Sequence, residues 1–124
     1  MRTSNEATVG TIAEMIAAKE CVKAGWKIAY PYGSDTPFDF LLYRSGQVRS
    51  VQVKGTQYER KENAGATRMV SMDKYQNIDY LICVDMIKEE CYVFEVGELP
   101  PSRIRITLKE ELYPLAFKAF NKLV

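Results

Sequence analysis

The stretch that decides the fold is residues 36–54, TPFDFLLYRSGQVRSVQVK, in which apolar and polar side chains alternate on both sides of a Ser45-Gly46 dipeptide. Alternation with a period of two predicts β-strands, and Ser-Gly is typical of a tight turn, so the stretch predicts a β-hairpin. With the turn centred on this dipeptide, the numbers of facing residues sum to 91. Asp39 is then expected to face Gln52.

One face of the predicted hairpin is apolar, and it consists of Phe38, Phe40, Leu42, Val51 and Val53. The other face brings Asp39, Gln52 and Lys54 together. Directly opposed Cβ atoms lie about 5 Å apart, and Lys54 follows Gln52 by two residues on the same strand. Burying an unpaired charge is costly, so the three groups either pair with one another or hold a charged ligand.

Both interpretations of these three residues are chemically reasonable. In the first, Asp39 and Lys54 form a structural ion pair that Gln52 bridges. In the second, the Asp39 carboxylate and an amide or main-chain oxygen bind Mg²⁺, a cation that prefers oxygen ligands and commonly also takes phosphate oxygens. Lys54 would then hold or deprotonate a water and offset the charge of a phosphorane-like transition state. The second interpretation describes a site that cleaves phosphodiesters.

The composition suits one compact domain over residues 1–124, with 47% hydrophobic residues. Lys and Arg total 17 and Asp and Glu 16, so any affinity for nucleic acid must come from the placement of charge. Cys21, Cys83 and Cys91 are widely spaced in apolar contexts, which predicts buried thiols in a reducing compartment. There is no His, no apolar leader and no run approaching the ~18 residues that span a bilayer. We therefore expect a cytoplasmic protein with no zinc site and no membrane partner.

The flanking sequence predicts a helix, further strands and a closing helix. Apolar residues recur at helical spacing between Ser4 and Gly25, and Gly25 is placed to end that helix. We expect short strands at 26–30, 66–72, 78–85, 91–96 and 103–108, and a polar loop or arm at 58–65. Residues 109–123 show a helical pattern of apolar side chains.

The order of three motifs along the chain resembles the PD-(D/E)XK nuclease superfamily. Glu14 lies within TIAEMIAAK, the PFDF segment contains Asp39, and VQVKG contains Gln52 and Lys54. Gln52 stands where most members of that superfamily place an acid. The patterns Ala-Glu, Gly-Trp, PFD and QVK are similar to a subgroup of small, oligomeric homing endonucleases typified by a cyanobacterial intron-encoded enzyme, and free-standing phage homing endonucleases are a further match.

The resemblance implies an α/β fold with a restriction-endonuclease-like core, in which an N-terminal helix precedes a mixed β-sheet flanked by helices. It also implies a Mg²⁺-dependent endonuclease, with Mn²⁺ as a possible substitute. Its site residues would be Glu14, Asp39, Gln52 and Lys54, and the main-chain carbonyl of Val53 would complete the metal site. Because the Gln52 amide adds no negative charge, the metal would be held less tightly and could number one rather than two.

A second set of polar residues follows the predicted catalytic strand, and it consists of Thr56, Gln57, Tyr58, Arg60, Lys61 and Arg68. We expect these residues to contact double-stranded DNA, since phosphate contacts come chiefly from Arg and Lys. A solvated loop is the plain alternative for this segment.

The preferred interpretation is a site-specific homing endonuclease from a bacterial, archaeal or phage-encoded context. It would act as a homodimer or homotetramer, because cutting both strands of a duplex requires two active sites. The alternatives are a Holliday-junction resolvase, which usually keeps an acid at the Gln52 position, and a non-catalytic DNA-binding or assembly module in which the Asp39–Lys54 pair is structural.

Overall fold

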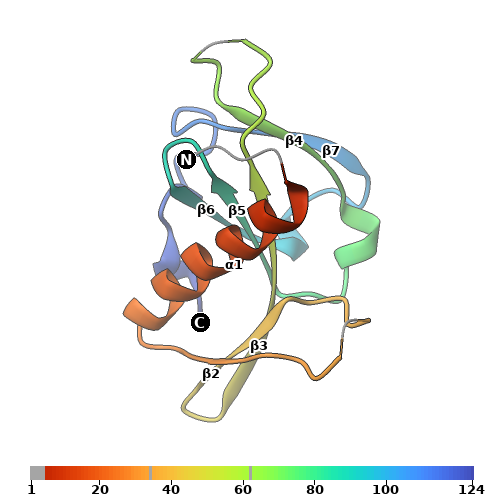
Figure 1. The fold of residues 1–124 in the computed structure, drawn as a ribbon. Helices are drawn as coiled ribbons and strands as arrows, with labels where there is room; N and C mark the ends of the chain where they lie inside the picture. Colours follow the sequence, from red (N-terminus) through yellow and green to blue (C-terminus); the bar gives the residue numbers. More distant parts are fainter. Residues whose placement is uncertain (1–4, 34, 62) are drawn as a thin grey trace.

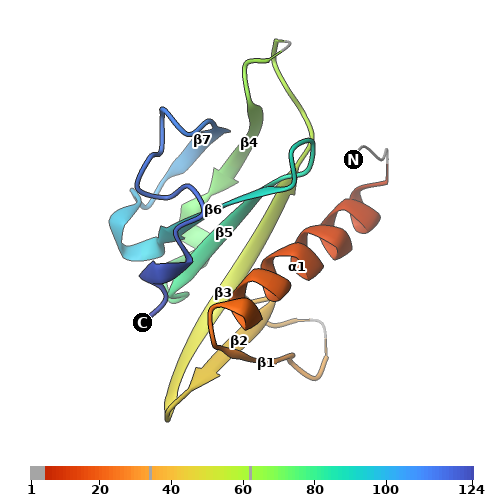
Figure 2. The same ribbon diagram turned by 90° about the vertical axis from the view of Figure 1, so that its left-hand side faces the viewer.

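A mixed five-stranded sheet forms the centre of the molecule, shown here as a computed structural model that describes residues 5–33, 35–61 and 63–124 (Figure 1). The sheet consists, in spatial order, of β1 (Lys27–Ala29), β2 (Phe40–Arg44), β3 (Gln47–Thr56), β5 (Tyr80–Asp85) and β6 (Glu90–Glu95). Neighbouring strands are antiparallel except for the parallel pair β3 and β5. The helix α1 (Glu6–Lys23) precedes the sheet and covers one face of it (Figure 2). This arrangement confirms the predicted core.

Both ends of α1 are fixed by local hydrogen bonds. The side chain of Asn5 accepts a hydrogen bond from the main-chain N–H of Thr8 at 3.2 Å, which satisfies one of the free N–H groups of the first turn. At the other end Gly25 has a φ of 99°, a conformation that glycine adopts without strain, and the N–H of Trp26 donates to the carbonyl of Cys21. Gly25 therefore ends the helix as the sequence predicts.

Small residues bring α1 close to β3. Ala13 and Ala17 on the inner side of the helix are fully buried, and Ala13 faces the buried strand residue Gly55. A Cβ atom added at Gly55 would lie 2.7 Å from the Cβ of Ala13 and 3.3 Å from a methyl of Val9. Because so little space separates the two elements, the residues that follow on α1 are held at a fixed distance from the strand.

We expect Gly55→Ala to lower the free energy of unfolding by about 1–3 kcal/mol, since the added methyl overlaps Ala13 in a packed interface. Urea unfolding followed by circular dichroism measures this change. Gly10→Ala is the matched control, because a Cβ at Gly10 meets nothing within 4 Å and alanine favours the helix. Equal stability of Gly55→Ala and the wild type would contradict the close approach.

The β2–β3 hairpin has the predicted register from Phe40 opposite Val51 to Arg44 opposite Gln47. Phe40, Leu42, Val51 and Val53 are buried together under α1, as expected. Phe38 differs, because it packs against the hydrophobic cluster on the opposite side of the sheet. The regular ladder begins at Phe40, so the alternation of faces does not extend back to Phe38.

A two-stranded ribbon covers the face of the sheet opposite α1 (Figure 2). It pairs β4 (Ala66–Ser71) with β7 (Arg103–Leu108) in antiparallel register. The short helix η1 (Met72–Tyr75) follows β4, and η2 (Val96–Glu98) follows β6. The ribbon encloses a second hydrophobic cluster of residues that includes Val70, Leu81 and Ile106.

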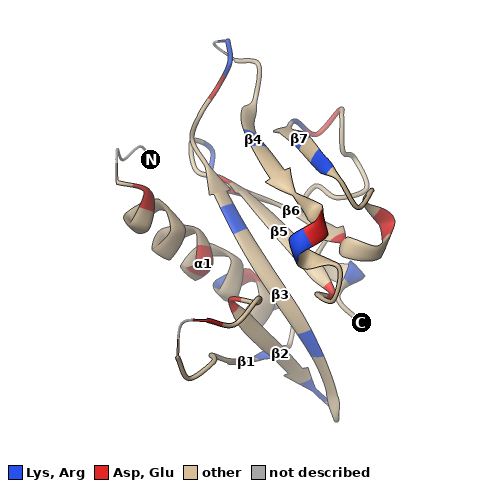
Figure 3. Cartoon of the chain, turned by 90° about the vertical axis from the view of Figure 1, so that its right-hand side faces the viewer, with Lys and Arg blue, Asp and Glu red and all other residues tan. Residues whose placement is uncertain are grey.

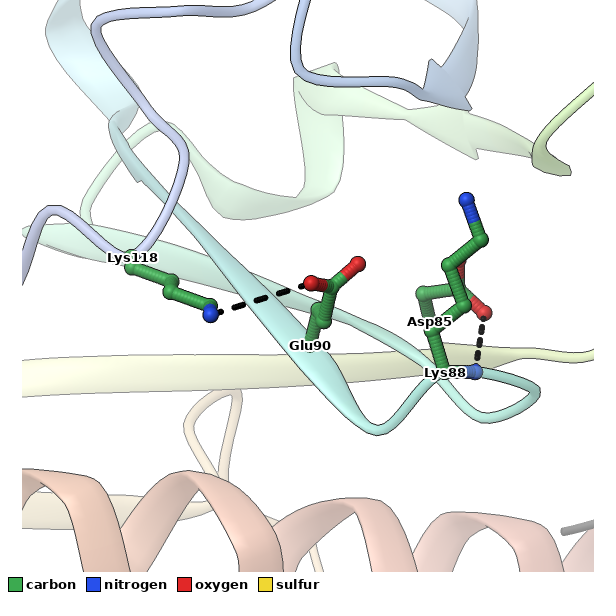
Figure 4. Close-up of polar contacts among 4 residues, drawn as sticks. All are labelled: Asp85, Lys88, Glu90 and Lys118. Carbon is green, nitrogen blue, oxygen red and sulfur yellow. Dashed lines mark hydrogen bonds and ion pairs between the residues drawn. The ribbon is translucent and has the colours of Figure 1, made fainter.

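The prediction of a helix over residues 109–123 is wrong. The segment forms turns and only the short helix η3 (Phe120–Lys122), and its main chain pairs with the edge of β6 instead. The N–H of Val93 donates to the carbonyl of Ala116, and the Lys118 ammonium lies 3.7 Å from the Glu90 carboxylate (Figure 4). Pro114 cannot donate to a helix ladder and Lys118 has a φ of 52°, so the helical pattern is not realised.

The three cysteines are buried free thiols, as expected. Burial raises the pKa of Cys21, Cys83 and Cys91 to about 12. Cys21 and Cys91 belong to the cluster under α1, and Cys83 belongs to the cluster under the ribbon. Within the described part of the chain, no helix is long and apolar enough to cross a membrane.

Candidate active site

A cleft of about 800 Å³ opens where β3 runs beyond the end of its neighbour β2. The β2 ladder stops at Phe40 opposite Val51, whereas β3 continues to Thr56 and leaves its last residues without a partner strand on that side. The helix α1 forms one wall of the cleft and β4 forms the other. Figure 3 shows α1 and β4 on either side of this end of β3.

Asp39 fills the position where β2 would otherwise have continued. Its N–H donates to the carbonyl of Val51 at 2.8 Å, and its carboxylate accepts a hydrogen bond from the N–H of Val53 at 2.7 Å. The carboxylate therefore reaches the main chain of β3 at Val53, and Asp39 does not continue the ladder that the hairpin pattern predicted opposite Gln52. The same residue ends the strand pairing and faces the cleft.

Glu14 approaches Asp39 from α1, and both carboxylates line the cleft. Burial and the neighbouring Asp39 charge raise the pKa of Glu14 above its usual 4.5. Burial also raises the pKa of Asp39, although the Val53 N–H and the Lys54 charge act in the opposite direction. The raised pKa values of these two carboxyl groups mean that a cation bound in the cleft would stabilise their charged forms.

This arrangement predicts how the stability of the metal-free protein depends on pH. A raised pKa in the folded state gives stability that is fully present below the usual pKa and is lost as pH rises through the raised value. In EDTA, the free energy of unfolding should fall as the pH rises above 4.5, and the fall should be smaller for Glu14→Gln. Urea unfolding from pH 4 to 8 measures this, with Met15→Gln on the exposed side of α1 as the control. Identical slopes for Glu14→Gln and wild type would contradict it.

Lys54 and Gln52 lie on β3 and line the same cleft. No ion pair within 4 Å joins Lys54 to Asp39 in the residues that the structure describes, so the predicted structural pair is not formed. The Lys54 ammonium lies instead 5.2 Å from the centre of the Tyr75 ring, which contributes about 0.5–1 kcal/mol and steers the ammonium. Its charge is thus available to a ligand in the cleft.

The donor groups of the cleft fit a hard divalent cation. The N–H and C=O of one strand residue point to the same side, so the Val53 carbonyl shares the edge at which its N–H meets Asp39. No three Asp, Glu, Cys or His side chains gather at one point among the residues with described positions. A cation would therefore be held by the carboxylates of Glu14 and Asp39, the Val53 carbonyl and the Gln52 amide oxygen, which is the oxygen-rich set that Mg²⁺ accepts.

The residues predicted to contact DNA fall into two groups. Arg68, Thr56, Gln57 and Tyr58 line the cleft, and the Arg68 guanidinium donates to the Gly55 carbonyl at 2.8 Å. The Thr56 hydroxyl is buried and donates to the carbonyl of Thr67 at 2.8 Å, so it joins β3 to β4.

Arg60 and Lys61 form the second group. They are exposed on the arm between β3 and β4 and lie outside the cleft lining. The described residues of the arm project beyond the body of the molecule (Figure 1).

A model of the PD-(D/E)XK endonuclease family matches residues 4–116 of this chain. The chain belongs to the PD-(D/E)XK endonuclease family. The match confirms the predicted family, and members of this family cleave nucleic acid, generally with divalent metal ions.

Two solved structures share the fold of this PD-(D/E)XK endonuclease. The bacterial homing endonuclease I-Ssp6803I superposes with a TM-score of 0.79 at 19% identity, over 99% of this chain and 92% of that one. Hjc, a Holliday junction resolvase from Archaeoglobus fulgidus, superposes with a TM-score of 0.62 at 18% identity, over 91% and 93% of the two chains. Protein 5.3 of Escherichia phage T7 is 26% identical over 95 residues, which cover 73% of this chain and 80% of the phage protein.

Sequence reasoning missed two features of the PD-(D/E)XK cleft. Tyr75 comes to Lys54 from η1, and no local pattern connects residues so far apart in the chain. Gly55 permits the close approach of α1 to β3, and the signal for it was a glycine inside a strand, which commonly marks close backbone approach.

Proposed function

We propose that this PD-(D/E)XK endonuclease hydrolyses DNA phosphodiester bonds with Mg²⁺, for which Mn²⁺ can substitute. The observation that carries the proposal is the open end of β3, where Glu14, Asp39 and the Val53 carbonyl share one cleft with Lys54. The raised pKa values of both carboxylates favour a cation between them.

Each group in the cleft has a chemical role in this proposal. Mg²⁺ bound there would supply Lewis-acid stabilisation of the negative charge on the phosphoryl oxygens. Lys54 orients the attacking water and balances charge at phosphorus, and the Arg68 guanidinium at the cleft wall binds a neighbouring phosphate. Water attacks phosphorus and releases a proton to solvent, the bond between phosphorus and the leaving deoxyribose oxygen breaks, and that oxygen takes a proton from solvent.

The leading version of the proposal is a site-specific homing endonuclease that acts on double-stranded DNA as a dimer or tetramer. An enzyme of this kind would act in the cytoplasm of a bacterial, archaeal or phage-infected cell. A Holliday-junction resolvase is the second version, and the neutral Gln52 weighs against it because resolvases usually keep an acid there. A non-catalytic module on the same fold would bind DNA without cutting it.

Digestion of a diverse DNA pool, with sequencing of the cut ends in Mg²⁺, Mn²⁺ or EDTA, tests the proposal. A homing endonuclease should cut linear duplex at one long site and only with metal. Preference for a four-way junction over a linear duplex of the same sequence would favour the resolvase version. Intact DNA under every metal condition, from a folded protein, would refute the nuclease proposal.

Gln52→Glu should tighten the binding of divalent cations by about tenfold or more, because the substitution adds a negative charge beside Glu14 and Asp39. Titration calorimetry with Ca²⁺ in the absence of DNA measures the change. In EDTA the same variant should be less stable than the wild type, since a third carboxylate adds repulsion. Gln47→Glu, at an exposed residue of β3 outside the cleft, is the matched control. Unchanged Ca²⁺ affinity would place Gln52 outside the metal site.

A further inference from the structure

The β4–β7 ribbon has an outer face, and only part of this face lines the cleft. Because side chains alternate along a strand, one face of the ribbon carries Ala66, Val70, Ile106 and Leu108, all buried against the sheet. The paired positions on the other face are Thr67, Met69 and Ser71 on β4 with Thr107, Arg105 and Arg103 on β7. Arg103 and Arg105 are exposed, and Met69 is 40% exposed.

The charge of this outer face differs from that of the whole chain. The chain has 17 basic and 16 acidic residues, yet the six outer positions of these two fully described strands include two Arg and no Asp or Glu. Arg103 and Arg105 follow each other at two-residue spacing, so their Cα atoms lie about 6.5–7 Å apart along one edge. Such a face complements a polyanion.

The outer face is also continuous with the cleft. Thr67 and Met69 belong both to this face and to the lining of the cleft, and Arg68 between them points to the β3 edge. Figure 3 shows basic positions on β3 and on β7, the strand of the ribbon farther from the cleft. A duplex seated over the cleft would therefore also meet the ribbon.

We propose that the outer face of the β4–β7 ribbon enters the major groove of the substrate DNA and reads base pairs beside the cut. The inference rests on the proposed DNA substrate. The major groove is about 12 Å wide and admits a two-stranded ribbon. Arg103 and Arg105 provide planar forks for the O6 and N7 atoms of guanine, and Met69 provides an apolar contact for a thymine methyl.

The test is a metal-free selection of bound DNA from a random duplex pool, sequenced for wild type, Arg103→Ala and Arg105→Ala. Each variant should lose a base preference at a specific position, and its Kd for the wild-type site should rise roughly 5- to 150-fold. Its affinity for random duplex should stay close to that of the wild type. Arg105→Lys should keep the general affinity and still lose the preference, because an ammonium has no planar fork.

Three controls make the outcome decisive. Lys27→Ala removes one exposed charge from β1, away from the ribbon, and should leave the selected sequence unchanged. Double-stranded RNA should not compete for the selected site, because its major groove is too deep and narrow for a ribbon. Urea unfolding verifies that the variants at these exposed positions are folded.

Several results would overturn the ribbon proposal. These are an unchanged profile for both Arg variants, a wild-type profile without any base preference, equal competition by RNA, and a uniform loss of affinity with a shallower salt dependence. The last result would assign the two Arg residues to phosphates. Cleavage of the pool in Mg²⁺ is measured separately. A wild type that cuts DNA without needing the ribbon residues would refute only the ribbon proposal. A wild type that binds DNA and never cuts it would refute the nuclease proposal.

Discussion

Lys54→Ala should reduce DNA cleavage by about 10²–10³-fold or more, because it removes the ammonium that we propose balances charge at the scissile phosphate. The loss should appear in the rate of the chemical step and leave DNA binding in Ca²⁺ largely intact. The Lys54 side chain contributes little to folding, since its contact with the Tyr75 ring accounts for less than about 1 kcal/mol. Single-turnover cleavage with saturating enzyme measures the effect.

Lys74→Ala is the matched control for this substitution. Lys74 is an exposed lysine beside Tyr75 on η1 and does not line the cleft. Loss of one charge there should leave the cleavage rate near that of the wild type. If Lys54→Ala cuts as fast as Lys74→Ala, Lys54 has no part in the chemistry and the assignment of the site is wrong.

Asp39→Asn should also reduce cleavage by about 10³-fold, through loss of cation binding rather than loss of the fold. The Asn oxygen can still accept the hydrogen bond from the Val53 N–H, so the end of β2 should stay in place. Burial raises the pKa of Asp39, which means that its charge destabilises the folded protein at neutral pH. In EDTA the variant should therefore be at least as stable as the wild type.

Thermal unfolding with and without Ca²⁺ separates these two effects. Wild type should gain stability as Ca²⁺ is added, because a ligand that binds only the folded state stabilises it, and Asp39→Asn should gain much less. Asp79→Asn is the control, since the Asp79 carboxylate also accepts a hydrogen bond from a β3 N–H, that of Ser50 at 2.8 Å, but outside the cleft. Equal gains for the two variants would remove Asp39 from the metal site.

Local pattern was sufficient for the parts of the fold that local geometry determines. The helix that ends at Gly25 and the hairpin register at Ser45-Gly46 follow from turn chemistry and side-chain periodicity, and both are present. The helical pattern after residue 109 was misleading, because its apolar residues do not form one buried helical face. Ala116 is buried, whereas Leu115 is 81% exposed.

The site was partly predictable for the same reason. Gln52 and Lys54 share a strand, so their common face follows from the alternation alone. Asp39 was expected opposite Gln52, but it leaves the ladder and turns its carboxylate to Val53, a local departure that periodicity does not encode. The position of Glu14 in the cleft depends on how α1 packs against the sheet. The family resemblance indicated this position, and the residue pattern alone did not. The catalytic and DNA-contacting roles of all these residues stay predictions.

The distribution of the three thiols provides a natural probe of how the two halves of the interior open. In the native state neither side of the sheet offers a reactive thiolate, because burial keeps the pKa of each cysteine at about 12. Alkylation at Cys83 requires exposure of the ribbon side, whereas alkylation at Cys21 or Cys91 requires exposure of the helix side. Peptide mapping after timed labelling can therefore establish which side opens first, without introducing any foreign reporter group.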